Sequence, residues 1–408
     1  MKTIKKNIAI LFGGHSSEYS ISLQSAAAVI RHLDTQLYQP ILVGIDQGGR
    51  WFRFYGGADA IEADTWQGGP CVPAVLSPDP SHHGLLEFHS TVPAAAGVPN
   101  NAGLPIADVP DIPNVFAADA ADGPYNPAAG TGGFSAGAAD GSTLWSDGAQ
   151  VSLTHIDAAF PVLHGKNGED GTVQGLLSLA GIPYVGCGLL ASALCMDKDV
   201  AHRLAKAAGV RVPRSVVLYD NDPRDDSTLA QQVAHLGYPL FIKPANAGSS
   251  FGITRVIHSG QLVPAVNEAF AHDYKVIIEE AIDGFEVGCA ILGHEKLIVG
   301  AVDEIELTEG FFDFTEKYTL KTSRIHMPAR ISPEDANRIK STAVTLYRAL
   351  ECSGFARVDL FFTKNREIVF NEINTIPGFT AHSRYPGMMK GIGLDFKTLL
   401  QKLLEVSL

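Results

Sequence analysis

The order of apolar runs at the start of the chain predicts an α/β layer. Residues 7–13 (NIAILFG) form a continuous apolar run that ends in glycine, which is typical of a buried parallel strand. A helical pattern follows at 21–33 (ISLQSAAAVIRHL), and a second apolar run lies at 40–45 (PILVGI). This strand–helix–strand order indicates a sheet covered by helices.

Further along the chain, helical spacing returns at 172–181, 196–209 and 330–352, and Ser332 is placed to cap the last of these helices. Apolar runs predict strands at 156–163, 182–186, 215–219, 275–282, 286–292, 354–363 and 367–375. A strand, a glycine-rich turn and another strand are expected within 238–256. The two strands nearest the C-terminus should be neighbours, because only a short turn separates them.

Residues 90–150 break this pattern. They contain 9 Gly, 7 Pro and 6 Asp but no Lys, Arg, His or Glu. Such a composition offers too little apolar surface to offset the entropy cost of ordering the chain. We therefore predict a flexible, disordered insertion at the surface. Glycine repeats of the calcium-binding kind are the alternative, although no fixed period is visible.

Composition favours a soluble globular protein of two or three domains. Of its 408 residues, 46% are apolar and 18% are charged. The net charge of −13 argues against a nucleic acid or an anionic membrane surface as partner, and no run of ~18 apolar residues predicts a membrane span. The five cysteines are widely spaced and fit neither a disulfide framework nor a zinc site, so we expect reduced thiols in a cytoplasmic protein.

Three side chains near the C-terminus suggest a metal site. Glu372 and Asn374 are two residues apart in an apolar strand and should point to the same face. Asp359 is a carboxylate within the preceding apolar strand. Because a buried carboxylate without a partner is costly, one or two hard cations such as Mg²⁺ would explain all three together. Separate structural hydrogen bonds are the alternative.

A second group of residues suits anionic oxygens. Lys243 ends an apolar strand, and the glycine-rich turn at 248–252 offers backbone N–H groups. The order of residues is not that of a Walker A motif. By itself the turn could be a plain connection between two strands.

Three further segments are candidates for contacts with a ligand. Glu18 follows the first strand and its glycine turn, although ordinary helix capping would explain it equally well. His164 lies at the end of a strand, where ligands collect in open α/β sheets. The aromatic and basic segment 310–322 could be a lid or a loop that anchors itself.

Eight motifs, taken together, resemble one family. They are GGHSSE, HGKNGEDGTVQG, ALCMDK, FIKPANAGSSFG, IEEAIDGFEVG, FFDFTEKY, GFARVD and FNEINTIPGF. In this order they are similar to the ATP-grasp enzymes of the D-alanine–D-alanine ligase group and cover nearly all of the chain except about 90–150. The resemblance implies α/β and α+β structure: an ATP-grasp fold with an N-terminal Rossmann-like (preATP-grasp) domain. We expect domains at 1–186, 187–279 and 280–408.

The resemblance also implies a reaction and a role for each matching residue. ATP phosphorylates the carboxylate of a first D-alanine, and the amine of a second substrate attacks the acyl phosphate. Two Mg²⁺ (or Mn²⁺) ions would bind Asp359, Glu372 and Asn374. Contacts with ATP are expected from Lys198, Lys243, Ser249, Ser250, Glu280, Ile282, Glu286 and Lys317.

Other matching residues would act on the reacting groups. Arg357 is expected beside the transferred phosphate, and the Gly378 N–H near the tetrahedral intermediate. Glu18 would orient the first substrate's ammonium, with His164 near its carboxylate. Ser249 and Tyr318 would link Glu18 to the lid, and Lys317 would reach the phosphate when the lid closes.

The loop that contains Ser383 and Arg384 resembles the vancomycin-resistance-type branch of the family. Its second substrate is D-serine or D-lactate, and the retained Tyr318 disfavours D-lactate. A guanidinium could hydrogen-bond a serine hydroxyl, with Asp303 and Phe312 shaping the pocket. The alternative is that Arg384 only pairs with a surface acid.

The resemblance leaves other readings open. D-Alanyl-D-alanine is the alternative product, and an ATP-binding regulatory protein without catalysis is the alternative class. A homodimer is expected, because it is the habit of the family. Residues 90–150 could bind a partner without affecting catalysis.

Overall fold

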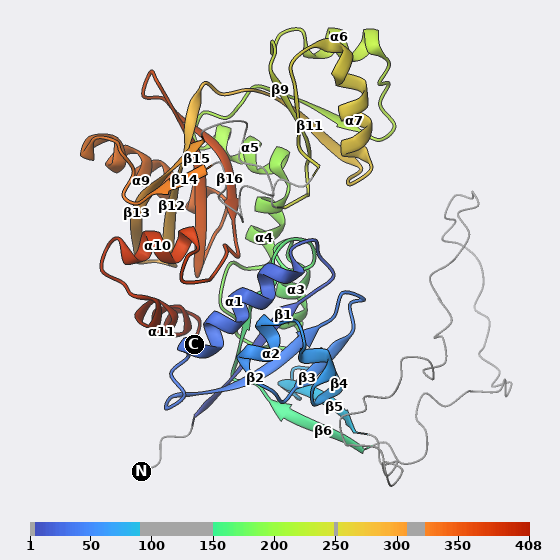
Figure 1. Ribbon diagram of the computed structural model, residues 1–408, viewed down its shortest axis with the longest axis vertical. Coiled ribbons are helices and arrows are strands. Elements are labelled where there is room, and N and C mark those ends of the chain that lie inside the picture. Colours follow the sequence, from blue (N-terminus) through green and yellow to red (C-terminus); the bar gives the residue numbers. More distant parts are fainter. Residues whose placement is uncertain (1–4, 90–149, 249–251, 308–322) are drawn as a thin grey trace, which may run out of the picture.

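The computed structural model describes residues 5–89, 150–248, 252–307 and 323–408, which build three β-sheets with their helices (Figure 1). The predicted insertion lies outside the described residues except for Gln150, and the whole of the predicted lid at 310–322 lies outside them too. In the described part of the chain, no helix is long and apolar enough to cross a membrane. All five cysteines are free thiols.

The first sheet has the strand order β6-β5-β4-β3-β2-β1-β7. Its strands are β1 (Lys6–Gly13), β2 (Tyr38–Ile45), β3 (Trp51–Phe54), β4 (Cys71–Leu76), β5 (Gly84–His89), β6 (Gln150–His155) and β7 (Ala158–Pro161). The predicted parallel pairing is correct for β1 with β2 and β7. The other strands of this sheet pair antiparallel, each with its neighbour in the sequence order β2 to β6.

Helices complete this first layer. They are α1 (Tyr19–His32), α2 (Ala58–Glu62), α3 (Thr172–Leu179) and the 3₁₀ turn η1 (Trp66–Gly68). The strand predicted at 182–186 is wrong: the segment makes only a single bridge, between Tyr184 and Ala159. Pro183 lacks a backbone N–H, and Gly186 turns the chain with φ +118°.

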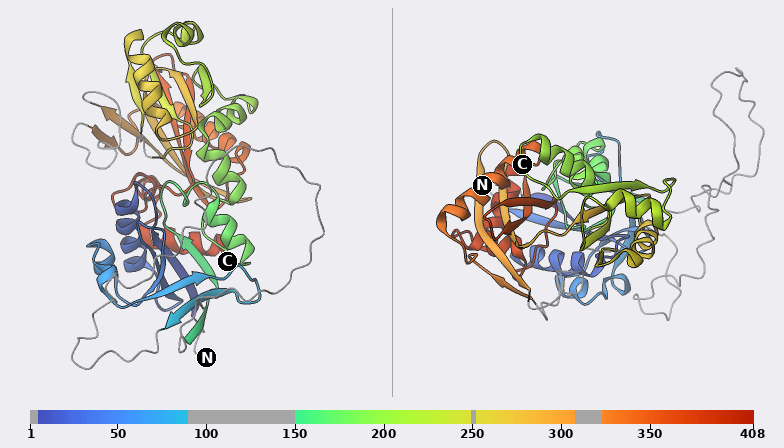
Figure 2. Two further views of the ribbon diagram at one scale, coloured as in Figure 1. Left: turned by 90° about the vertical axis from the view of Figure 1, so that its right-hand side faces the viewer. Right: turned by 90° about the horizontal axis from the view of Figure 1, so that it is seen from above.

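The second sheet is a small antiparallel layer with the order β10-β9-β11-β8. It contains β8 (Ser215–Tyr219), β9 (Leu240–Pro244), β10 (Thr254–Val256) and β11 (Lys275–Glu280). Two helices cover the sheet, α6 (Asp226–Val233) and α7 (Leu262–Phe270) (Figure 2). The turn η3 (Ser259–Gln261) directly precedes α7. The predicted strand–turn–strand unit is confirmed by the antiparallel pairing of β9 with β10.

The third sheet has the order β14-β13-β12-β15-β16. Its strands are β12 (Gly284–Gly293), β13 (Leu297–Leu307), β14 (Ser323–His326), β15 (Phe355–Thr363) and β16 (Ile368–Asn374). The helices around it are α4 (Leu189–Met196), α5 (Lys198–Ala207), α9 (Pro333–Ala349), α10 (Arg384–Lys390) and α11 (Phe396–Ser407). The predicted cap of α9 is confirmed, because the Ser332 side chain accepts the Asp335 N–H.

Aromatic rings join the first sheet to the third. Phe160 on β7 packs against Phe355 on β15 with ring centroids 6.4 Å apart, and Phe379 lies 5.9 Å from Phe160 and 5.8 Å from Phe355. Tyr385 on α10 adds an edge-to-face contact with Phe355 at 5.3 Å. These rings are fully buried. The cluster therefore holds together the two parts of the chain that carry the predicted site.

We expect Phe355→Ala to lower the free energy of unfolding by about 3–5 kcal/mol, since it removes a buried ring at the junction of the two sheets. Urea denaturation measures this difference. Ser332→Ala, which removes a helix cap far from the cluster, should cost only ~1 kcal/mol. A loss for Phe355→Ala no larger than the loss for Ser332→Ala would contradict the role given to the cluster.

Candidate active site

A cavity of about 500 Å³ lies between α1 of the first layer and the loops that follow β16 in the third. Residues from segments far apart in the sequence line it. Among them are seven that the sequence predicted for substrate, intermediate or metal: Glu18, His164, Arg357, Asn374, Gly378, Ser383 and Arg384. The structure thus brings the predicted residues of both ends of the chain into one place.

Glu18 immediately precedes α1, and its carboxylate is buried where three segments meet. A Cβ atom at Gly165 would lie 2.5 Å from Glu18 Oε2, and one at Gly248 would lie 2.9 Å from it. Only glycine permits so close an approach of backbone to carboxylate. The predicted phosphate turn therefore begins beside the predicted ammonium ligand.

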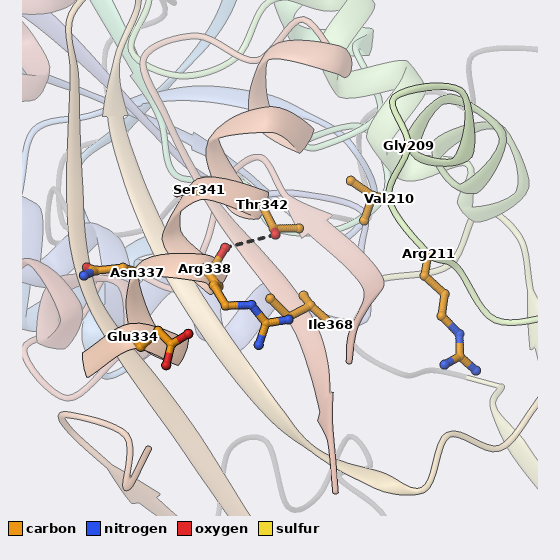
Figure 3. Close-up of a pocket in the computed structure, with 9 residues that line it drawn as sticks. All are labelled: Gly209, Val210, Arg211, Glu334, Asn337, Arg338, Ser341, Thr342 and Ile368. Atoms are coloured by element: carbon orange, nitrogen blue, oxygen red, sulfur yellow. Dashed lines mark hydrogen bonds between the residues drawn. The ribbon is translucent and has the colours of Figure 1, made fainter. Parts of the chain in front are cut away.

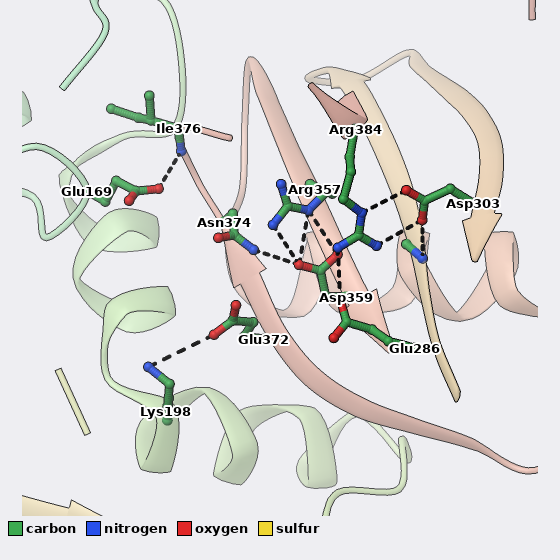
Figure 4. A network of polar contacts seen from close by, with 11 residues as sticks. Glu169, Lys198, Glu286, Asp303, Arg357, Asp359, Glu372, Asn374, Ile376 and Arg384 are labelled. Carbon is green, nitrogen blue, oxygen red and sulfur yellow. Dashed lines mark hydrogen bonds and ion pairs between the residues drawn. The ribbon is translucent and has the colours of Figure 1, made fainter. Parts of the chain in front are cut away.

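The predicted metal ligands share one face of the β15–β16 pair (Figure 4). Asp359 lies opposite Glu372, and Arg357 lies opposite Asn374. The Asn374 amide donates to Asp359 Oδ2 at 2.9 Å, and Arg357 donates to the same carboxylate through Nε and Nη2 at 2.9 and 2.8 Å. The Lys198 ammonium lies 4.0 Å from the Glu372 carboxylate.

Arg384 is the buried centre of an ion network. Its Nε and Nη2 donate to the two oxygens of Asp303 at 2.7 and 2.8 Å, and its Nη1 donates to Glu286 at 2.8 Å. The same Nη1 lies 3.3 Å from Asp359. Asp303 is completely buried, so the alternative in which Arg384 pairs with a surface acid is wrong.

Comparison with known proteins gives a consistent result. Models of the N-terminal and C-terminal domains of D-alanine–D-alanine ligases match residues 7–187 and 204–405. The vancomycin C-type resistance protein VanC1 of Enterococcus gallinarum is 38% identical over 404 residues, which cover 98% of each chain. The chain belongs to the D-alanine–D-alanine ligase family.

Two other similar proteins differ in the second substrate that their names give. A putative D-alanine–D-lactate ligase of Streptomyces coelicolor is 38% identical over 406 residues, covering 98% of this chain and 97% of the relative. The crystal structure of the VanG D-Ala:D-Ser ligase from Enterococcus faecalis is 46% identical with a TM-score of 0.78, covering 99% of this chain and 100% of that one. Membership makes the chain an ATP-dependent ligase and confirms the predicted ATP-grasp fold.

The second sheet of the ligase presents a buried ion pair toward the predicted phosphate site. The Lys243 ammonium lies 2.6 Å from Glu279 Oε2, and both side chains are buried. Burial alone would raise the pKa of Glu279, but Lys243, His202 and Lys198 together hold it below its usual value. Glu279 was not among the predicted residues, whereas its neighbour Glu280 was. Period two along β11 could not separate the two, because Ile277 and Ile278, which share their respective faces, are both fully buried.

Two buried atoms at this ion pair lack a hydrogen bond. Glu279 Oε1 and His202 Nδ1 are 3.4 Å apart, and neither has a hydrogen-bond partner in the part of the chain that the structure describes. Such atoms are costly unless a ligand satisfies them. This is a property expected of a pocket that binds a polar, nitrogen-rich group.

Lys198 is fixed by the start of α5. Its ammonium donates to the Ala247 carbonyl at 2.6 Å. The preceding Asp197 caps the helix, and its carboxylate is paired with the buried Lys275 at 3.0 Å. Lys275 also lies 2.6 Å from Asp199. Lys275 was not predicted either, because nothing in the run at 275–282 indicates a partner 78 positions away.

Two of the predicted ATP contacts lie at the end of β11. Glu280 accepts the backbone N–H of Arg214 at 2.9 Å, and its other oxygen lies 2.6 Å from the Arg214 guanidinium. The Ile282 carbonyl accepts the Gly284 N–H at 3.0 Å. Ser249, Ser250, Phe312, Lys317 and Tyr318 fall outside the described residues, so their predicted roles stay predictions.

The predicted metal site carries an excess of buried negative charge. Burial, with the carboxylates of Asp359 and Glu372, raises the pKa of Glu286 to about 7, although Arg384 acts in the opposite direction. The carboxylates of Glu286, Asp303, Asp359 and Glu372 meet three cations in this network, namely Arg357, Arg384 and Lys198. Within the described residues no three His, Cys, Asp or Glu side chains form a metal cluster; the predicted set offers two carboxylates and the amide of Asn374, which are oxygen ligands of the kind a hard cation takes.

A second cavity, of about 630 Å³, lies between the end of α5, β16 and α9 (Figure 3). None of the predicted site residues lines it. Its Arg338 is committed to Asp335 at 2.9 Å and to the Arg366 carbonyl at 2.9 Å. We therefore place the active site in the first cavity and not in this one.

We expect Glu279→Gln to lower the free energy of unfolding by about 3 kcal/mol at pH 7, because it leaves the buried Lys243 ammonium without its counter-charge. The pKa of Glu279 is depressed in the folded ligase, so its contribution is present above the unfolded pKa of ~4.3 and is lost as pH falls through the folded pKa. The difference from wild type should therefore shrink below pH ~4. Urea denaturation at several pH values tests this.

Glu280→Gln is the matched control for this experiment. It makes the same chemical change one position along β11, where the Arg214 partner is largely exposed, and should cost no more than ~1 kcal/mol. Equal losses for the two variants would contradict the special position of Glu279.

Proposed function

We propose that this ligase joins D-alanine to a second D-amino acid, with D-serine as the preferred second substrate, for the synthesis of cell-wall precursors. The observation that carries the proposal is the single cavity lined by Glu18, Arg357, Gly378 and Arg384. It combines a carboxylate for an ammonium group, a cation and a backbone donor for developing negative charge, and a polar wall for a hydroxyl.

The proposed reaction has two steps. The γ-phosphoryl group of ATP is transferred to the carboxylate of the first D-alanine, which gives ADP and D-alanyl phosphate. The neutral amine of the second amino acid then attacks the acyl carbon, a proton leaves the nitrogen, and phosphate departs. Lys198 and Lys243 neutralise the phosphates of ATP, and Arg357 faces the transferred group.

ATP would bind between the second and third sheets. The buried Lys243–Glu279 pair and the unsatisfied Glu279 Oε1 fit a nucleotide, because an exocyclic amine can donate to that oxygen. Glu280 and Ile282 are proposed at the adenine, and Glu286 at the ribose. Burial, with the carboxylates of Asp359 and Glu372, raises the pKa of Glu286 to about 7.

Mg²⁺ fits the third sheet for the same electrostatic reason. Asp359, Glu372 and Asn374 would hold it, since they present oxygen ligands on one face of paired strands. Bound there, it would neutralise charge on the phosphates of ATP.

Arg384 supports D-serine through a hydrogen bond that is still available. Its Nε and Nη2 each donate to Asp303 and its Nη1 meets Glu286 and Asp359, so of its five N–H groups the second one at Nη2 is not used by these bonds. A substrate hydroxyl can accept it. The solved D-Ala:D-Ser ligase, similar over 99% of this chain, agrees with this assignment. D-Alanyl-D-alanine synthesis is the second candidate, favoured by the family models.

We also propose three domains, at 1–186, 187–279 and 280–408. Each would contain one of the three sheets, to within one residue at the end of β11. In this arrangement the cavity lies between the first domain and the third.

We expect D-alanyl-D-serine to dominate when the purified ligase is incubated with Mg-ATP and equimolar D-alanine and D-serine, as measured by mass spectrometry of the products. Arg384→Lys keeps the charge but loses the forked geometry. Loss of a charge-assisted hydrogen bond should shift the product ratio toward D-alanyl-D-alanine by roughly 10-fold or more. Dominant D-alanyl-D-alanine from the wild type would instead support the second candidate.

Glu372→Gln should reduce ADP formation by about 10²-fold or more, since it removes one charged oxygen ligand from the proposed Mg²⁺ site. A coupled assay of ADP release at several Mg²⁺ concentrations measures this. Glu367→Gln, just before β16 and paired with Arg211 at the surface, is the control and should retain wild-type turnover. Turnover of Glu372→Gln equal to that of the control would exclude the metal assignment.

A further inference from the structure

The loop 376–379, which carries Gly378, is held at both ends by side chains of the first layer. At its start, the Ile376 N–H donates to Glu169 Oε1 at 3.1 Å, and the Ile376 carbonyl lies 2.8 Å from His164 Nδ1 (Figure 4 shows the first of these bonds). At its end, the Phe379 N–H donates to Ser25 Oγ at 3.2 Å. Neither Glu169 nor Ser25 was singled out by the sequence analysis.

One further hydrogen bond closes these contacts into a ring. Ser25 Oγ lies 3.1 Å from His164 Nε2. Because Ser25 accepts from the Phe379 N–H, its own hydrogen is available to donate to Nε2. His164 then carries its proton on Nδ1 and donates it to the Ile376 carbonyl, which can only accept. With His164 neutral and protonated at Nδ1, every donor in the ring meets an acceptor. This tautomer is assigned from the hydrogen-bond network.

Glu169 adds a second connection between the two layers. Its Oε2 accepts the Gly165 N–H at 2.8 Å while its Oε1 accepts the Ile376 N–H. An ionised carboxylate is an acceptor at both oxygens, so it can serve two backbone donors at once. The side chain therefore ties the loop after β7 to the loop after β16.

The hydrogen bonds at Ile376 and Phe379 restrict the direction in which the Gly378 N–H between them can point. Ile376 and Phe379 are buried, so the loop cannot shift freely at either end. Between them, Pro377 has a restricted φ and no N–H of its own. The Gly378 N–H is the remaining backbone donor of this segment, and Gly378 lines the cavity together with Arg357.

We propose that Glu169 and Ser25 are positioning residues, which act through the backbone of 376–379 to aim the Gly378 N–H at the oxyanion of the second step. The proposal rests on the proposed function, because Gly378 has this role only in a D-alanyl phosphate mechanism. His164 is the intermediate member of the ring. In this proposal both side chains act through the backbone of the loop and not on a reacting atom, although Glu169 also lines the cavity.

The proposal predicts a defect confined to one half of the reaction. Phosphoryl transfer does not use the Gly378 N–H, whereas attack by the amine does. When attack is slow, water can cleave the D-alanyl phosphate, which returns D-alanine and releases phosphate. ADP is then formed without dipeptide. A loss of general stability would lower both products together and leave their ratio at one.

Glu169→Gln provides the first test, because glutamine has one acceptor oxygen where the loop needs two. We expect kcat for dipeptide formation to fall about 10-fold, which is less than the ~10²-fold loss of rate that a 1 Å misplacement of a catalytic group can cause. The KM values for ATP and the first D-alanine should stay within about twofold, and the ratio of ADP to dipeptide should rise above one. The matched control is Asp170→Asn, since Asp170 also accepts two backbone N–H groups but only within its own loop.

Ser25→Ala provides the second test, with Ser22→Ala as its control. Both serines are buried in α1, but Ser22 bonds only the first sheet, through the Gly13 N–H and the Val162 carbonyl. Ser25→Ala should raise the ratio of ADP to dipeptide, whereas Ser22→Ala should leave it at one even if stability falls. Unchanged ratios in both Glu169→Gln and Ser25→Ala would overturn the proposal and leave the ligase assignment intact.

Hydrogen exchange separates this proposal from the proposed function. Amide exchange at Ile376 and Phe379 in the whole protein should be at least ~10-fold faster in Glu169→Gln and Ser25→Ala than in their controls, regardless of activity. Unchanged exchange would show that these side chains do not hold the loop. If exchange accelerates but the wild type makes no dipeptide, the loop is held as described, and both the proposed function and the catalytic purpose of the ring fail.

Discussion

The pairing of buried charges on the third sheet is the constraint on which the site depends. Asp303 is fully buried, and Asp359 nearly so, among apolar strands. An ion removed from water is tolerated only when an opposite charge and hydrogen bonds replace its solvation. Arg384 meets both oxygens of Asp303, and Arg357 meets both oxygens of Asp359. The side chains of this network, of which Arg357 and Arg384 line the cavity, therefore have very few alternative arrangements.

The negative and positive charges of this network are unequal in number, which bears on the ligands proposed to bind there. Its carboxylates outnumber its guanidinium groups, so the fold holds negative charge near the place where a cation and a nucleotide are proposed to bind. Burial is the main cause of the raised pKa of Glu286, and the neighbouring carboxylates of Asp359 and Glu372 add to it. A positive ligand bound beside these carboxylates would offset part of the free-energy cost of burying them.

Two kinds of interaction hold the first layer against the third sheet at the cavity, and they differ in how far they fix the orientation of the loop. The rings of Phe160, Phe355 and Phe379 bury apolar surface, which is strong but gives little direction. The hydrogen bonds of Glu169 and His164 to Ile376 are individually modest but set orientation. A site that must aim a single backbone N–H needs both, because packing alone would permit small rotations of the loop.

Local patterns in the sequence determined the predicted strands other than 182–186, the Ser332 cap, the shared face of Asp359, Glu372 and Asn374, and the ordered motifs of the family. Each depends on residue type and short-range period, which the chain carries wherever it folds. Tertiary structure alone decided the antiparallel part of the first sheet, the ion pair of Glu279 with Lys243, and the partners of Arg384 and Ser25. Those contacts join positions 81 and 354 residues apart, and only packing selects which buried charge or hydroxyl meets which backbone group.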